Sequence, residues 1–305
     1  MLRNILTNLL FILLTGLFLK SQVGFAFTIP DSHFAVAGDW ACKPETIATI
    51  NNIRTKNPDI IFALGDLSYE NTGDCWLNEI SSLDKTKIRI VMGNHEEEPG
   101  IPTSLVSQYK KSFSLAKTFY SFDFKNVHFT IMDSNIPFDI NSQQYSFVTK
   151  DLLTASQNDS IKWRVVLFHH PIYTSPTEFY KGNDEMRKIY HPIFDHYGID
   201  LVLQAHNHNY QRTYPLTYNY STSDEDPIVT SLNKTTYEHP SGEVYVVVGT
   251  AGKALYNFLA RAKYNVSQFV GHGFFDVALA NNGTRLDCRL YDNDGKIMDH
   301  FSIIK

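Results

Sequence analysis

Short apolar runs, each followed by a polar break, organise the first two thirds of the chain. Four of these runs are continuous rather than alternating, which is the pattern expected of strands covered on both faces. They are His33–Ala37, Ile60–Leu64, Ile88–Met92 and Arg164–Phe168. Helix-like stretches lie between them at Glu45–Lys56 and Trp76–Leu83, the first closed by an Asn-Pro pair. This alternation of strands and helices predicts an α/β fold.

The rest of the chain predicts a hairpin, two helices and a strand-rich final third. Thr118–Phe124 and Val127–Asp133 are expected to pair as a hairpin. The next elements are expected to be two helices and a short strand, at Tyr145–Ala155, Asp184–Tyr197 and Leu201–Leu203. Tyr218–Glu238 is polar and is expected to be a long surface loop. The last strands are expected at Glu243–Val248, Phe274–Ala280, Thr284–Asp292 and Ile297–Ile303, and Asn-Gly or Asp-Gly turn signals separate the later ones.

Composition excludes several classes of protein. The 305 residues are 43% hydrophobic and 19% charged, so a disordered, collagen-like or coiled-coil chain is excluded. Lys and Arg number 27 against 32 Asp and Glu, and this balance offers no basic face for nucleic acid. Any anionic ligand must therefore be held by a local positive site, and bound metal is the obvious source.

The N-terminus has the pattern of an export signal. Arg3 precedes the apolar run Leu9–Leu19, and small residues follow around Ala26. We therefore expect a signal peptide at residues 1–26, a single catalytic domain at 27–305 and a secreted protein. An uncleaved segment would instead anchor the chain to a membrane. Asn-x-Ser/Thr sequons that suit a secreted glycoprotein occur at Asn158, Asn219, Asn233, Asn265 and Asn282.

Three cysteines remain after such an export signal. An oxidising compartment favours one bridged pair. We expect Cys42 and Cys75 to form it, because each follows a strand-like run by a few residues. Cys288 is then expected to be a buried free thiol. A thiolate zinc site is not expected from three cysteines at this spacing.

Five apolar runs end in Asp, Asn or His. In open α/β sheets ligands bind beyond the carboxyl ends of the strands, so these side chains should converge. Each piece alone has an ordinary explanation, such as a turn or a helix cap after Gly-Asp. Together they offer carboxylate, phenol, amide and imidazole groups, all of which bind metals. The blocks are Gly38-Asp39, Gly65-Asp66-Leu67-Ser68-Tyr69, Gly93-Asn94-His95-Glu96, Val166-Leu167-Phe168-His169 and Ala205-His206-Asn207-His208.

This series of blocks resembles the purple acid phosphatases of the calcineurin-like metallophosphoesterase superfamily. The family pattern is Gly-Asp, Gly-Asp-x-x-Tyr, Gly-Asn-His-Asp/Glu, Val-x-x-His and Gly-His-x-His, and the resemblance continues through Tyr210–Pro215. The separate N-terminal β-domain of the large plant enzymes has no counterpart. The resemblance implies two packed mixed β-sheets flanked by helices, with the site along one edge of the sandwich.

The resemblance also implies two metal ions that share one ligand. Ferric iron would be one of them, because a phenolate ligand at acid pH requires a highly charged ion, and iron, zinc or manganese would be the other. Tyr69 is the most diagnostic position, since related phosphoesterases usually lack a tyrosine ligand there. The first ion would be bound by Asp39, Asp66, Tyr69 and His208, and the second by Asp66, Asn94, His169 and His206.

The expected reaction is hydrolysis of a small phosphate monoester by in-line attack of a metal-bound hydroxide. His95 and Asn94 would bind the substrate, and His95 would protonate the leaving oxygen. Two departures from the family bear on this: Ala205 replaces a glycine, and Tyr173–Asn183 lacks the substrate-facing histidines of the relatives. A phosphodiesterase and a non-catalytic metal-holding protein therefore remain alternatives. We also expect His170 to line the rim or to pack rather than bind metal, and His191 and His196 to lie on the surface.

Overall fold

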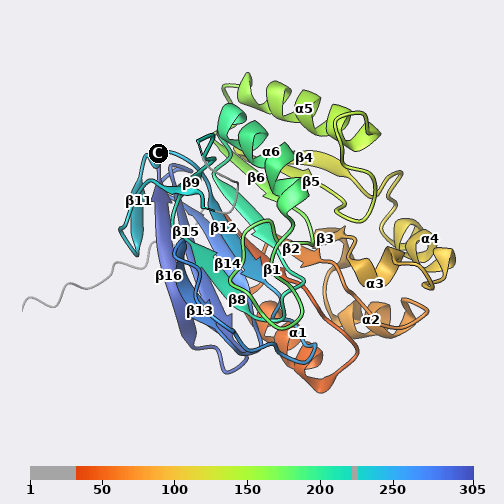
Figure 1. The fold of residues 1–305 in the computed structure, drawn as a ribbon. Coiled ribbons are helices and arrows are strands. Elements are labelled where there is room, and N and C mark those ends of the chain that lie inside the picture. Colours follow the sequence, from red (N-terminus) through yellow and green to blue (C-terminus); the bar gives the residue numbers. More distant parts are fainter. Residues whose placement is uncertain (1–31, 222–225) are drawn as a thin grey trace, which may run out of the picture.

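The computed structural model describes residues 32–221 and 226–305, so the predicted signal peptide lies outside the described residues. The described chain forms two seven-stranded sheets that pack face to face, and a two-stranded ribbon (Figure 1). The predicted sandwich with flanking helices is thereby confirmed. Within the described ranges, no helix has the length and apolar character needed to cross a membrane.

The first sheet joins N-terminal and C-terminal strands. Its parallel half runs β1 (Ser32–Ala37), β2 (Ile60–Leu64) and β3 (Ile88–Val91). On the other side of β1 lie three antiparallel strands, β14 (Gly273–Ala280), β15 (Arg285–Asp292) and β16 (Ile297–Ile304). The short β11 (Thr236–Glu238) pairs in parallel with β16.

The second sheet has a parallel centre and antiparallel edges. Its order is β13-β8-β12-β7-β6-β5-β4, with β5, β6, β7 and β12 parallel. The predicted hairpin is confirmed as the pair β4 and β5. The bounds are β4 (Tyr120–Phe124), β5 (Val127–Ile131), β6 (Trp163–Leu167), β7 (Leu201–Gln204), β8 (Tyr210–Thr213), β12 (Val244–Val248) and β13 (Asn265–Phe269).

Helices cover the outer face of each sheet. Figure 1 shows α5 (Gln143–Ser156) and α6 (Asp184–Tyr197) beside the second sheet, and α1 (Pro44–Lys56) at the opposite side of the molecule. The shorter helices gather near β3, outside the first sheet. They are α2 (Asp74–Glu79), the 3₁₀ turns η1 (Ile80–Ser82) and η2 (Lys85–Lys87), α3 (Asn94–Glu97) and α4 (Thr103–Ser112).

Alternating residues of the parallel strands pack into different cores, which is why these strands read as continuous apolar runs. Phe62 of β2 packs between the sheets against Phe129 of β5, with ring centroids 4.9 Å apart. Its neighbours Ile61 and Ala63 face the other way and pack under α1 and α2. A third core lies beneath α5 and α6. The cores on both faces hold the strand ends in fixed positions.

The disulfide prediction is confirmed. Cys42 and Cys75 are bonded, and Cys288 is a buried free thiol. Two surface predictions are wrong. Asn265 is buried, and its amide nitrogen donates to Ser175 Oγ at 2.7 Å and Gln211 Oε1 at 2.8 Å, so this sequon is closed in the folded chain.

Other local expectations are also corrected. His191 has an exposed fraction of 0%, because the apolar face of α6 carries it inward, whereas His196 is exposed as expected. The stretch expected as one surface loop contains β11 and β10 (Ile228–Val229), which pairs with β9 (Leu216–Thr217). Pairing with neighbouring strands overrides the polar composition there.

Candidate metal centre

The polar residues that follow five strands come together at one edge of the sandwich. Two clusters of potential ligand atoms form there, and all atoms of a cluster lie within 4.8 Å of one another. They share a single carboxylate, that of Asp66, which follows β2. The clusters are Asp39, Asp66 and His208, and Asp66, His169 and His206.

The first cluster includes the predicted tyrosine. The Tyr69 hydroxyl lies 3.1 Å from Asp39 Oδ1 and 3.0 Å from His208 Nε2. His208 Nε2 and Asp39 Oδ1 are 3.4 Å apart. Asp39 is fully buried and His208 nearly so. The phenol oxygen, the carboxylate and the imidazole nitrogen therefore face one point, as the sequence predicts.

The second cluster brings in the predicted amide. Asn94 Oδ1 lies 2.9 Å from His206 Nδ1. That nitrogen lies 3.2 Å from His169 Nε2, which is in turn 3.4 Å from Asp66 Oδ1. All seven predicted ligand residues are thus neighbours in the structure, although they come from both sheets.

Backbone carbonyls orient two of the imidazoles. His169 Nδ1 donates to the Leu64 carbonyl and His208 Nδ1 donates to the Ala254 carbonyl, both at 2.7 Å. A carbonyl oxygen only accepts, so these bonds place the second nitrogen of each ring toward the carboxylates. Such carbonyl–histidine pairs commonly orient metal-binding histidines.

The charges at the centre fit a bound cation. Burial lowers the pKa of His169, but the negative charge of Asp66 and their hydrogen bond outweigh burial and raise it to about 10. Burial, then the carboxylates of Asp39 and Asp66, raises the pKa of Tyr69 well above its usual value. The buried carboxylates are therefore stabilised by nearby positive charge, which a proton on His169 supplies when no metal is bound. Metal cations would supply that charge and favour the phenolate.

Four of the predicted ligands have left-handed backbone conformations. The φ angles are 60° at Asp39, 52° at Asp66, 58° at Tyr69 and 66° at His206. Such conformations cost roughly 1–3 kcal/mol each in non-glycine residues and gather at functional sites. They turn the side chains toward one another just after each strand ends.

Close backbone approach explains two small residues at the centre. A Cβ atom on Gly93 would clash with the Asp66 carboxylate. Gly38 faces Ala205, whose methyl group already fills the space that a Cβ on Gly38 would need. The departure from the family glycine at position 205 is therefore accommodated opposite a glycine.

Glu96, whose role the sequence did not predict, joins the loop after β2 to the loop after β3. Its buried carboxylate accepts from the backbone N–H groups of Asp66 at 2.9 Å, Leu67 at 2.8 Å and Gly93 at 2.8 Å. Its place in the Gly-Asn-His-Glu block was the available signal. Glu96 therefore positions the loop after β2 against the loop after β3.

His95 lies on the solvent side of the centre. Its side chain is 40% exposed, and its Nε2 is 3.9 Å from Asp66 Oδ2. Its ring packs on Tyr69 with centroids 4.2 Å apart. His170 lies at the rim as expected: its ring is 4.4 Å from that of His206, and its Nδ1 pairs with Ser134 Oγ at 2.8 Å.

Three further residues border the centre and were missed in the sequence. The Lys253 ammonium lies 3.6 Å from the centroid of the Tyr69 ring. Tyr256 stacks on His208 at 3.9 Å between centroids. Tyr180 packs edge-on against His206 at 4.4 Å. The segment that lacks histidines therefore contributes a phenol ring. No pattern in the chain distinguishes these residues from core residues.

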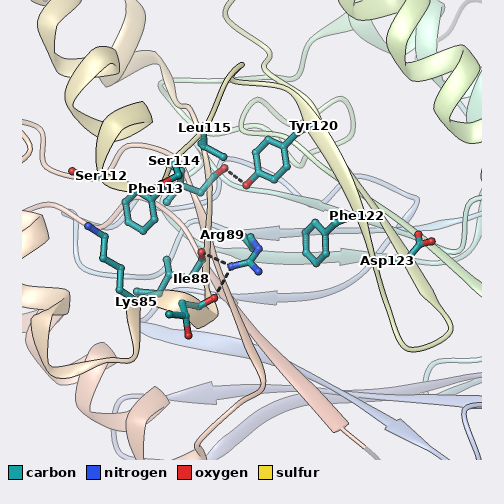
Figure 2. Close-up of a pocket in the computed structure, with 12 residues that line it drawn as sticks. Lys85, Ile88, Arg89, Ser112, Phe113, Ser114, Leu115, Tyr120, Phe122 and Asp123 are labelled. Carbon is teal, nitrogen blue, oxygen red and sulfur yellow. Dashed lines mark hydrogen bonds between the residues drawn. The ribbon is translucent and has the colours of Figure 1, made fainter.

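A cavity of about 710 Å³ lies away from these residues, between β3 and β4 at the edge of the sandwich (Figure 2). Its lining includes none of the predicted site residues. Arg89 in this cavity donates to the carbonyls of Thr86 at 2.8 Å and Ile88 at 3.0 Å. Its guanidinium group is therefore already paired with the local backbone. The convergence of ligand groups, rather than a deep pocket, identifies the candidate site.

Comparison with known proteins agrees with this geometry. Residues 31–210 match the family model described as calcineurin-like phosphoesterase. The chain is 26% identical to purple acid phosphatase 15 of Arabidopsis thaliana, over 72% of this chain and 45% of the relative. It is 24% identical to a protein named probable inactive purple acid phosphatase 1 of the same plant, over 82% and 44%. The chain thus spans about half the length of the curated relatives it matches.

The fold comparison gives the same result. A purple acid phosphatase from yellow lupin seeds superposes with a TM-score of 0.74 at 23% identity, covering 90% of this chain and 53% of that one. This likeness shows a shared fold. Together with the family-model match, it establishes that the chain belongs to the calcineurin-like phosphoesterase family, in which it is similar to the purple acid phosphatases.

Proposed function

We propose that the chain is a binuclear-metal acid phosphatase that hydrolyses small phosphate monoesters. The observation that carries the proposal is the convergence of five residues into two ligand clusters that share Asp66, with Tyr69 and Asn94 in contact with one cluster each. Polar residues that only form turns or helix caps do not need to converge on one site from two sheets.

The ligand roles follow the two clusters. Ferric iron would be held by Asp39, Tyr69 and His208 together with Asp66. The second ion, which would be iron, zinc or manganese, would be held by the residues Asp66, Asn94, His169 and His206. When bound, the two ions act as Lewis acids on the phosphate and supply an activated water nucleophile at acid pH.

The side chains on the solvent side would bind and orient the substrate. Asn94 and His95 follow β3 side by side, and the His95 ring is held by its packing on Tyr69. His95 is exposed enough to meet an incoming ester, and its Nε2 would give a proton to the leaving oxygen. Lys253 adds a positive charge that would attract a phosphate dianion.

Secretion belongs to the same proposal. Residues 1–26 would be removed as a signal peptide, and 27–305 would form the secreted catalytic domain. A disulfide between Cys42 and Cys75 suits an oxidising compartment. Asn158, Asn233 and Asn282 are exposed and would be available for glycosylation.

The test compares a chromogenic phosphate monoester with its diester at pH 5, before and after metal chelation. We expect faster hydrolysis of the monoester and loss of activity on chelation. Asp66→Asn should lower activity by more than the roughly 10- to 100-fold typical of residues that merely orient a ligand. Asp294→Asn, at an exposed carboxylate, is the matched control.

Two outcomes would contradict the proposal. A preference for the diester would make the chain a phosphodiesterase of the same family. Absent turnover with both ions bound would make it a metal-holding binding protein, in line with the missing histidines of residues 173–183 and with relatives named as inactive.

A further inference from the structure

A second group of metal-ligating side chains shares no residue with the candidate centre. His191 and Asp195 lie one turn apart on α6, and Glu243 comes directly before β12. His191 Nε2 lies 3.2 Å from Glu243 Oε1 and 3.7 Å from Asp195 Oδ1. Nitrogen and oxygen atoms of all three residues fall within 4.8 Å of one another.

Each of these side chains has one buried polar atom without a partner. The other carboxylate oxygens are paired: Glu243 Oε1 accepts from the Tyr245 hydroxyl at 2.5 Å, and Asp195 Oδ2 accepts from the Tyr218 backbone N–H at 2.8 Å. His191 and Glu243 have exposed fractions of 0%. His191 Nε2, Glu243 Oε2 and Asp195 Oδ1 form no hydrogen bond with any residue that the structure describes. Burying such groups unpaired is costly. Three side chains that meet in one cluster, each with an orphaned buried atom, therefore indicate a missing partner.

The missing partner must carry positive charge or protons, because the orphaned carboxylate oxygens are acceptors and the Tyr245 hydroxyl already donates to Glu243 Oε1. The carboxylates of Asp195 and Glu243 accept only, and the Leu216 carbonyl also faces the imidazole. His191 Nδ1 pairs with the Tyr173 hydroxyl at 2.8 Å. When Nδ1 donates its proton to the Tyr173 oxygen, Nε2 presents a lone pair to the carboxylates.

The distances suit one small cation. With Zn–N and Zn–O bonds of about 2.0–2.2 Å, ligand atoms around a tetrahedral zinc ion lie roughly 3.3–3.6 Å apart. The 3.2 and 3.7 Å separations from His191 Nε2 lie on either side of this range. The 3.2 Å separation is also within hydrogen-bond reach, but this contact lacks the alignment of a hydrogen bond. Two carboxylates and one neutral imidazole would also balance the charge of a divalent ion.

We propose that His191, Asp195 and Glu243 bind a zinc ion that joins α6 to the start of β12, with water as the fourth tetrahedral ligand. Asp195 is the outermost ligand, with a side chain 18% exposed, and provides the side from which the ion enters. The ion would cross-link a helix of the outer layer to the second sheet. The stability of α6 on that sheet would then depend on zinc.

The alternative to a cation is a proton held within the cluster. Burial, then the charge of Asp195, raises the pKa of the Glu243 carboxyl well above its ordinary value. Burial lowers the pKa of His191 to about 3. Without an ion the cluster must therefore hold a proton on a carboxyl group, and a shared proton is the competing explanation.

The test measures zinc in the full chain after equilibration with Zn²⁺ and dialysis. Glu243→Gln and Asp195→Asn should each lose one zinc ion per chain relative to the unmutated protein. Glu185→Gln, at an exposed position of the same helix, should lose none. Asp66→Asn changes only the candidate centre and should keep this ion, so failure here is distinguishable from failure of the proposed function.

A crystal of the unmutated protein with zinc provides a readout that does not depend on how the variants fold. An anomalous peak at the zinc edge between His191 Nε2, Asp195 Oδ1 and Glu243 would support the site. No peak there, or equal zinc content in the folded variants, would overturn it and assign a shared proton to the cluster.

Discussion

The Tyr69 hydroxyl lies 3.0 Å from His208 Nε2, although 139 positions separate the two residues in the chain. Tyr69 follows β2 of the first sheet, and His208 follows β7 of the second. The candidate centre therefore depends on how the two sheets pack. It exists only in the folded chain, and ions bound there would stabilise the sandwich by mass action.

Glu96→Gln should weaken metal binding without removing a ligand. A glutamine amide nitrogen would face the N–H donors of Asp66, Leu67 or Gly93, and the loops after β2 and β3 would lose their common anchor. We expect a loss of roughly 10- to 100-fold in metal affinity or activity. Titration of the metal-free protein with metal measures it.

Glu98→Gln is the matched control, because Glu98 is an exposed neighbour on the same segment. It should bind metal like the unmutated chain. Equal affinities for the Glu96 and Glu98 variants would show that the carboxylate of Glu96 is not needed to position the loops.

His95→Asn should slow the hydrolysis of phosphate esters of aliphatic alcohols most. Such leaving groups need a proton, and general acid catalysis contributes about 10²- to 10⁴-fold. Nitrophenolate leaves without protonation, so hydrolysis of a nitrophenyl ester should be slowed much less. The measurement is kcat for both esters, with His196→Gln at an exposed position as control. Equal losses on both esters would mean that His95 does not protonate the leaving oxygen.

Much of the fold was predictable because buried parallel strands have simple patterns. Ile60–Leu64 and Asp184–Tyr197 were predicted with the bounds that the structure shows. The helix α4 and the strands β8 and β13 were not predicted. Their sequences are mixed in polarity. The form of α4 is set by packing, β8 pairs with β12, and β13 pairs with β8.

The convergence of the candidate ligands was predictable because they lie within a few residues of the end of an apolar run. The surroundings of the site were not. Lys253 and Tyr256 reach it from the segment after β12, which has no distinctive local pattern. His191 was misjudged because its burial depends on which face of α6 meets the sheet.

His33 should make stability depend on pH. Its Nδ1 lies 2.7 Å from Asp276 Oδ1, and this hydrogen bond is the main cause that raises the pKa of His33 above 6.5. The stabilisation that protonated His33 gives the folded chain is fully present below about pH 6.5. It is lost as the pH rises through the raised pKa of His33. His33→Gln should cost about 2 kcal/mol at pH 5 and less at pH 8. Denaturant unfolding at both pH values measures this, and an equal cost would contradict it.

The Cys42–Cys75 disulfide should stabilise the loops around the centre. It joins residues 33 positions apart, and closing a loop of that size is worth about 3–4 kcal/mol in the chain-entropy model. The double variant Cys42→Ser, Cys75→Ser should therefore unfold at lower temperature. Cys288→Ala, which removes a buried thiol outside the disulfide, is the control. Unchanged unfolding of the double variant would show that the disulfide does not stabilise the fold.

The most direct test of the binuclear centre is metal analysis of the purified protein together with its visible spectrum, before and after Tyr69→Phe. We predict two ions per chain at this centre, at least one of them iron, in addition to any zinc held by His191, Asp195 and Glu243, and a purple or pink absorption band that disappears in the variant. A colourless and fully active zinc or manganese protein would contradict the assignment of Tyr69 to ferric iron and leave only the broader phosphoesterase assignment.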